Sequence, residues 1–131
     1  MEDFLHMAKI IYSKDAPEPI GPYSQAVLAG GMLYCSGQVP IDPTTNEIVG
    51  DTIEVQTERT IKNISAVLSA AGLDFDNVVK ATCYLKSMDD FAAFNAIFAK
   101  YFTKKPARAC IEAARLPKDV LVEIEVIAEA V

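Results

Sequence analysis

The sequence contains very little histidine and cysteine. His6 is its single histidine, which excludes Ser–His and Cys–His activation of a nucleophile unless another base replaces the imidazole. The cysteines, Cys35, Cys83 and Cys110, are odd in number and form no Cys-x-x-Cys pair. This pattern supports neither a disulfide framework nor a zinc site, and it favours a reducing compartment.

Long apolar runs and excess positive charge are also missing. No apolar run approaches the length of a membrane span, so no membrane partner is expected. A formal net charge of −6 repels phosphate backbones, so no nucleic-acid partner is expected either. With 131 residues, 51% hydrophobic and 23% charged, the chain fits one globular domain with a real core.

The first residues, MEDFLHMAK, are acidic and contain neither an apolar h-region nor an arginine. We therefore expect no secretory signal and no typical mitochondrial presequence, and a cytoplasmic location, with a mitochondrial one left open. Met7 can itself serve as an initiator. The prediction is a disordered extension over residues 1–8 and a single domain over residues 9–131.

Hydrophobic periodicity predicts about six strands and two helices. Strands are expected at residues 9–13, 25–28, 32–36, 77–86, 107–113 and 120–128, with Gly30–Gly31 forming a two-residue hairpin turn. One helix is expected from a cap at Asp51 or Thr52 to Gly72, with an exposed Glu58–Lys62 pair. The second helix is expected to begin after Ser87.

The order strand, helix, strand over residues 77–113 predicts a crossover between parallel strands. The expected fold class is therefore α+β, with a mixed six-stranded sheet and two helices packed on one face. The other sheet face then has little in this chain to cover it. It is either polar or packed against another subunit, and we expect a homo-oligomer.

Alternation also sorts side chains within the strands. In the run 77–86, the alternation predicts that four side chains point inward, namely Val79, Ala81, Cys83 and Leu85. The aromatic stripe of the second helix is interpreted as core packing. In the run 107–113, Arg108, Cys110 and Glu112 share one face, and Glu123 and Glu125 share a face of the last strand. Two readings stay open for these charges: a solvated sheet face, or an anion pocket beside a carboxylate.

Two blocks carry a resemblance to a known family. They are IGPYSQ (20–25) with SGQ (36–38), and PAR (106–108) running through LPKD (116–119) to EIE (123–125). Over almost the whole chain, this sequence resembles the RidA family, also called YjgF/YER057c/UK114. The resemblance implies a chorismate-mutase-like fold, a homotrimer with sites between subunits, and hydrolysis of 2-imino or enamine acids to 2-oxo acids and ammonia.

The resemblance also implies roles for individual residues. The carboxylate-binding arginine corresponds to Arg108, the acid beside the attacking water to Glu123, and a main-chain water contact to Cys110. Further pocket positions correspond to Tyr23, Ser36, Gly37 and Asn95. The chain departs from the pattern in a shorter segment before Pro106, residues 103–105, and in Ala113, where valine is common.

Different function classes remain open at this point. The first is a deaminase for 2-iminobutanoate and 2-iminopropanoate released by threonine and serine dehydratases, which needs neither a metal nor an organic cofactor. The second is a non-catalytic trimer that binds small carboxylates or has a chaperone-like or regulatory role. Endoribonuclease activity is disfavoured by the charge of −6. For Tyr23, Ser36 and Asn95, a purely structural role is an equal alternative.

Overall fold

A computed structural model describes residues 8–130 of the chain, so the proposed N-terminal extension, His6 included, lies almost entirely outside the described residues. Its strands are β1 (Lys9–Ile11), β2 (Ala26–Ala29), β3 (Met32–Cys35), β4 (Val78–Leu85), β5 (Ala107–Glu112) and β6 (Val122–Glu129). Its α-helices are α2 (Ile53–Ala70) and α3 (Phe91–Tyr101), and short 3-10 turns are η1 (Phe75–Asn77), η2 (Met88–Asp90) and η3 (Pro117–Asp119).

The six strands form one mixed sheet in the order β1-β2-β3-β6-β4-β5. All neighbours are antiparallel except β4 and β5, which are parallel and joined by α3, as the predicted crossover requires. The β2–β3 turn is made by Gly30 and Gly31, with φ of 59° and 77°. These positive values explain why the turn uses two glycines.

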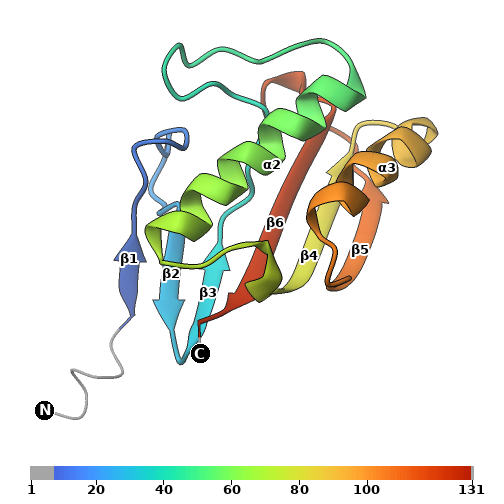
Figure 1. Ribbon diagram of the computed structural model, residues 1–131. Helices are drawn as coiled ribbons and strands as arrows, with labels where there is room; N and C mark the ends of the chain where they lie inside the picture. The colour runs from blue at the N-terminus through green and yellow to red at the C-terminus, as the bar shows by residue number, and fades with distance from the viewer. Residues whose placement is uncertain (1–7, 131) are drawn as a thin grey trace, which may run out of the picture.

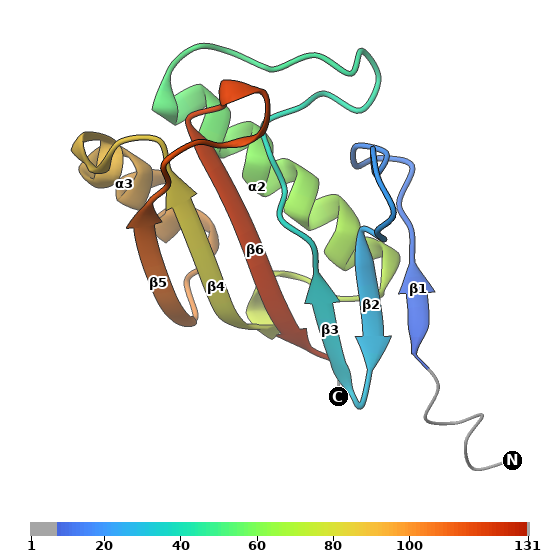
Figure 2. The ribbon, with the colours of Figure 1, turned by 180° about the vertical axis from the view of Figure 1, so that it is seen from behind.

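Both helices cover the same face of the sheet, and within residues 8–130 no helix covers the other face (Figures 1 and 2). Thr52 caps α2 by accepting a hydrogen bond from the Val55 amide at 3.3 Å, and the chain leaves the helix through Gly72 at φ 74°. Between helices and sheet lies a continuous apolar core, whose fully buried members include Leu33, Leu68 and Phe94. The predicted α+β class is therefore confirmed.

One inward assignment was wrong. Val79 is 42% exposed, and Val78 takes the buried position in its place. The cause is a register shift between Val78 and Lys80 in the pairing of β4 with β6. Such a bulge adds a residue to one strand, so strict alternation fails across it. Beyond the bulge the prediction holds, since Ala81, Cys83 and Leu85 are fully buried.

The uncovered sheet face carries an apolar row. Consecutive strand partners across four strands place their side chains side by side on it: Ile10, Val27, Tyr34 and Ile127. Ile10 and Tyr34 are among the most exposed large hydrophobic residues that the structure describes. No helix within residues 8–130 is long and apolar enough to cross a membrane.

Candidate functional site

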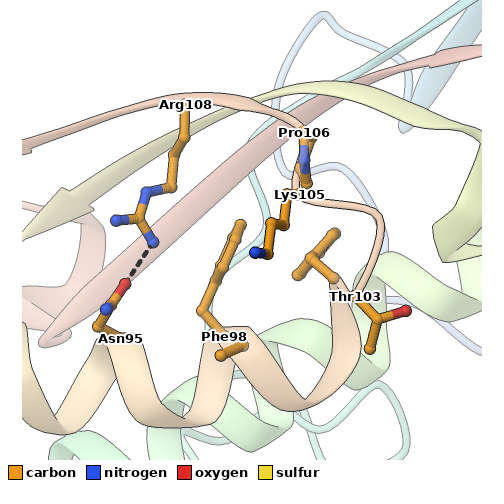
Figure 3. Close-up of a pocket in the computed structure, with 8 residues that line it drawn as sticks. Asn95, Phe98, Thr103, Lys105, Pro106 and Arg108 are labelled. Atoms are coloured by element: carbon orange, nitrogen blue, oxygen red, sulfur yellow. Dashed lines mark hydrogen bonds between the residues drawn. The ribbon is translucent and has the colours of Figure 1, made fainter.

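Arg108 projects from β5 toward α3. Its strand partner on β4 is the fully buried Ala81, so the guanidinium lies on the helix-covered face of the sheet. There Nη1 donates a hydrogen bond of 2.6 Å to Oδ1 of Asn95 (Figure 3). The guanidinium carbon also lies 4.8 Å from the ring centroid of Phe98 and 5.5 Å from that of Phe91. An amide and two aromatic rings thus hold the cation in one orientation.

The Arg108 side chain opens into a cavity of about 600 Å³, which we call the arginine cavity. It is lined by Asn95, Phe98, Ala99, Phe102, Thr103, Lys105, Pro106 and Arg108. Two of these residues are cationic and none is acidic. Within residues 8–130, Arg108 and Lys105 form no ion pair with a carboxylate.

A second cavity, of about 340 Å³, contains Glu123 and is called the glutamate cavity here. Loops from the N-terminal part of the chain supply Tyr23, Ser36 and Gly37 to its wall, and η3 supplies Lys118. A Cβ atom added to Gly37 would lie 2.0 Å from Oε2 of Glu123. Gly37 is therefore required by the close approach of this carboxylate, rather than by a positive φ.

The environment of Glu123 disfavours its charge. Burial, with a smaller contribution from the charge of Glu125 two residues away on the same strand face, raises the pKa of the Glu123 carboxyl. Glu125 in turn accepts a hydrogen bond from the hydroxyl of Tyr84, the β4 partner of Glu123. That bond is the main reason that the pKa of Tyr84 is raised to about 12.

Other sequence-derived positions have local partners. The Ser36 hydroxyl donates a 2.6 Å hydrogen bond to the carbonyl oxygen of Ser24, so its proton is engaged with the backbone. The Tyr23 hydroxyl accepts a long hydrogen bond of 3.5 Å from the Ile20 amide, and Tyr23, which lines the cavity, is 51% exposed. Tyr23 therefore has more freedom to contact a ligand than Ser36 has.

Cys110 lines neither cavity. Burial raises the pKa of its thiol, with a smaller opposing effect from Arg108, so the thiol is mostly protonated at neutral pH. Cys110 is a free cysteine opposite Cys83 in the β4–β5 ladder. Among residues 8–130, no group of three or more His, Cys, Asp or Glu side chains is arranged to hold a metal ion.

The sequence-derived residues thus fall into two groups within one chain. Arg108 and Asn95 line the arginine cavity, whereas Glu123, Tyr23, Ser36 and Gly37 line the glutamate cavity. Glu123 alternates with the buried Val122 and Ile124, so it projects from the uncovered sheet face, opposite to the face of Arg108. Neither cavity of a single chain therefore contains both Arg108 and Glu123.

Sequence reasoning missed several lining residues. Lys105 and Phe98 belong to the arginine cavity, and Gln38 and Lys118 to the glutamate cavity. For Lys105 the departure in segment 103–105 was the available signal. Lys118 belongs to the LPKD block that carries the family resemblance, but its place at the cavity depends on a positive φ of 55° in η3, which the sequence pattern does not reveal.

The chain is similar to known proteins over nearly its whole length. The family model described as Endoribonuclease L-PSP matches residues 13–130. A protein named putative regulator AldR, from Lactococcus lactis, is 57% identical over 122 residues, which are 92% of this chain and 97% of that protein. The 2-iminobutanoate/2-iminopropanoate deaminase of Salmonella typhimurium is 44% identical over 126 residues, covering 93% and 98% of the two chains.

Solved structures agree with the fold. The crystal structure of E. coli TdcF with bound serine has a TM-score of 0.88 at 41% identity, over 92% of this chain and 98% of that chain. The names of these relatives refer to regulation, deamination and RNA cleavage. Family resemblance alone therefore leaves several activities to choose from, and the site geometry has to discriminate among them.

Proposed function

The chain belongs to the endoribonuclease L-PSP family, the RidA/YjgF family that its sequence resembles, and from this premise we propose that it is a 2-iminobutanoate/2-iminopropanoate deaminase. The proposed reaction hydrolyses an imine or enamine intermediate, of the kind that threonine and serine dehydratases release, to a 2-oxo acid and ammonia. The 44% identical Salmonella deaminase supports this assignment.

One observation carries the proposal. The guanidinium of Arg108 is oriented by Asn95 and Phe98 but is not neutralised by any acidic residue in the described chain. Its remaining N–H groups are free for a planar anion, and a 2-imino acid presents a carboxylate next to its C=N carbon. A bidentate Arg–carboxylate pair fixes orientation as well as charge, which a lysine would not do.

Glu123 supplies the proton transfers in this proposal. Its carboxylate accepts a proton from water as the oxygen attacks the C=N carbon, and it passes this proton to the nitrogen to give a carbinolamine. It then takes the hydroxyl proton of this adduct and delivers it to the amino group, so that the C–N bond breaks, ammonia leaves and the 2-oxo acid remains. A carboxyl with a raised pKa exchanges protons closer to neutral pH than an ordinary glutamate. No metal or organic cofactor takes part in this scheme.

The active form in this proposal is a homotrimer. Arg108 and Glu123 project from opposite faces of one sheet, so a complete site needs the arginine cavity of one protomer and the glutamate cavity of another. The uncovered face, with its apolar row of Ile10, Val27, Tyr34 and Ile127, is the surface that a neighbouring protomer would bury.

The decisive experiment is a coupled assay. Purified protein is added to a threonine dehydratase reaction with semicarbazide as the trap, and the proposal requires that the semicarbazone yield falls as the imine is hydrolysed. An unchanged imine lifetime would eliminate the deaminase. If ligand binding persisted without turnover, a non-catalytic carboxylate-binding trimer would replace it. The net charge of −6 argues against RNA as the substrate.

A further inference from the structure

Three cations gather in the short segment before β5. Although the chain as a whole has a net charge of −6, residues 104–108 read KKPAR. Two of these cations, Lys105 and Arg108, line the same arginine cavity, and Figure 3 shows Lys105 extending into the space beside Phe98. Lys104, the third, does not line it.

Lys105 occupies an unfavourable backbone conformation. Its φ is 56°, in the left-handed region that favours glycine or asparagine, and its amide donates a 3.1 Å hydrogen bond to the carbonyl oxygen of Phe102 at the end of α3. The direct turn from α3 into β5 sets this geometry. A lysine in such a conformation, with its side chain at a cavity, marks the ammonium group as a candidate for binding a ligand.

The charge of the arginine cavity exceeds what a monocarboxylate needs. Arg108 suffices to bind one carboxylate, and no acidic residue lines the cavity or pairs with either cation within residues 8–130. The second positive charge is therefore available to a second anionic group on the same ligand. The volume of about 600 Å³ leaves room for a substituent longer than a methyl or ethyl group.

We infer that Lys105 extends the substrate range of the site to 2-imino dicarboxylic acids, with Arg108 binding the carboxylate beside the imine and Lys105 the carboxylate at the far end. The claim that these acids are substrates rests on the proposed function, whereas the claim that the cavity binds dicarboxylates does not. The dicarboxylate preference belongs to the arginine cavity, and a stable 2-oxo acid, the product analogue, is sufficient to measure it.

The test is calorimetric titration of the native assembly with two 2-oxo acids of equal chain length, 2-oxoglutarate and 2-oxopentanoate. The wild-type protein is expected to bind the dicarboxylate about fivefold more tightly, the upper range for a charge pair that involves an exposed lysine. Lys105→Gln removes this preference and leaves the affinity for 2-oxopentanoate unchanged. Lys105→Arg restores it.

Lys104→Gln is the matched control, because it removes the same charge one residue outside the cavity. It is expected to keep the preference for 2-oxoglutarate. Equal affinities in the wild-type protein, binding of neither acid, or the same loss from Lys104→Gln and Lys105→Gln would each overturn the inference. Failure of the proposed function looks different: the imine lifetime is unchanged, whatever the order of the 2-oxo acid affinities.

Discussion

Gly37 and Glu123 are in such close contact that a single methyl group at residue 37 would displace the carboxylate. The added Cβ would lie 2.0 Å from Oε2 and 2.9 Å from the carboxyl carbon of Glu123. The end of a glutamate side chain can move away from such a clash, but only by leaving its present position in the glutamate cavity. The glycine therefore fixes where the proposed acid–base group stands.

Gly37→Ala is expected to lower kcat about 10- to 100-fold, because misplacing a general acid–base group loses part of its contribution. Steady-state kinetics in the imine assay measure it, and circular dichroism checks the fold. Gly21→Ala is the control, since a Cβ there meets only ordinary 3.5 Å contacts with the Tyr23 ring. Equal losses from both variants would contradict the positional role of Gly37.

Glu123→Gln is expected to lower the activity strongly and to stabilise the fold. Burial and Glu125 raise the pKa of the Glu123 carboxyl, so the folded chain binds this proton more tightly than the unfolded chain does. As pH rises from the unfolded toward the folded pKa, the native state loses stability, and this loss persists at every higher pH. Glutamine carries no charge and avoids it.

Thermal unfolding of Glu123→Gln should show a Tm about 2–5 °C above that of the wild type at pH 7, and kcat should fall about 10²- to 10⁴-fold. The difference in Tm should shrink as the pH is lowered and the wild-type carboxyl becomes protonated. Glu129→Gln makes the same change at an exposed position of β6 and should alter neither quantity. A lower Tm for Glu123→Gln would mean that the carboxylate stabilises the fold.

How much of this arrangement could be predicted from the sequence depends on the range of the interactions. The hairpin at Gly30–Gly31 and the helix between Thr52 and Gly72 follow from local backbone chemistry, and both are confirmed. The exposed pairing of Glu58 with Lys62 was wrong. Glu58 instead binds Lys100 at 3.1 Å and accepts a hydrogen bond from Tyr101, both on α3, which are tertiary contacts that spacing within one helix does not reveal.

The candidate site shows the same limit. Alternation correctly predicted that Arg108 and Cys110 share one face of their strand and Glu123 and Glu125 one face of theirs. It did not predict that these are opposite faces of the sheet. That depends on the register of β4 with both neighbours and on α3 covering the edge strand, where Asn95 and Phe98 meet Arg108.

Tyr84→Phe tests whether the hydroxyl group bound to Glu125 tunes Glu123. Without the donated hydrogen bond, the charge of Glu125 is less compensated and disfavours ionisation of Glu123 more strongly. The acid limb of the kcat/KM pH profile should therefore move to higher pH, by a few tenths of a unit to about one unit. Tyr34→Phe removes a hydroxyl from the same sheet face and should leave the profile in place. A shift to lower pH would refute the coupling.

Cys110 is expected to be dispensable, in contrast to Arg108. Its thiol lines neither cavity and has a raised pKa, so neither nucleophilic nor acid–base work falls to it. Cys110→Ala should retain most of the activity. Arg108→Ala should raise KM and lower kcat/KM by more than about tenfold, because the charge-assisted hydrogen bonds of the arginine contribute about 1.5–3 kcal/mol to binding. Comparable losses from the two variants would give the thiol a role in the reaction.

Subunit complementation tests the shared site most directly. Arg108→Ala lacks a working arginine cavity and Glu123→Gln lacks a working glutamate cavity, so each pure variant loses most of its activity for a different reason. In a ring of three chains with each site made by two neighbours, every mixed trimer contains one interface that pairs an intact Arg108 with an intact Glu123.

Unfolding and refolding the two variants together at equal amounts should thus recover about a quarter of wild-type activity, because about three quarters of the trimers are mixed and each has one of its three sites restored. Refolding each variant alone is the control. A mixture that stays inactive would mean that Arg108 and Glu123 do not meet across an interface, and the two cavities would then have to be explained as separate sites.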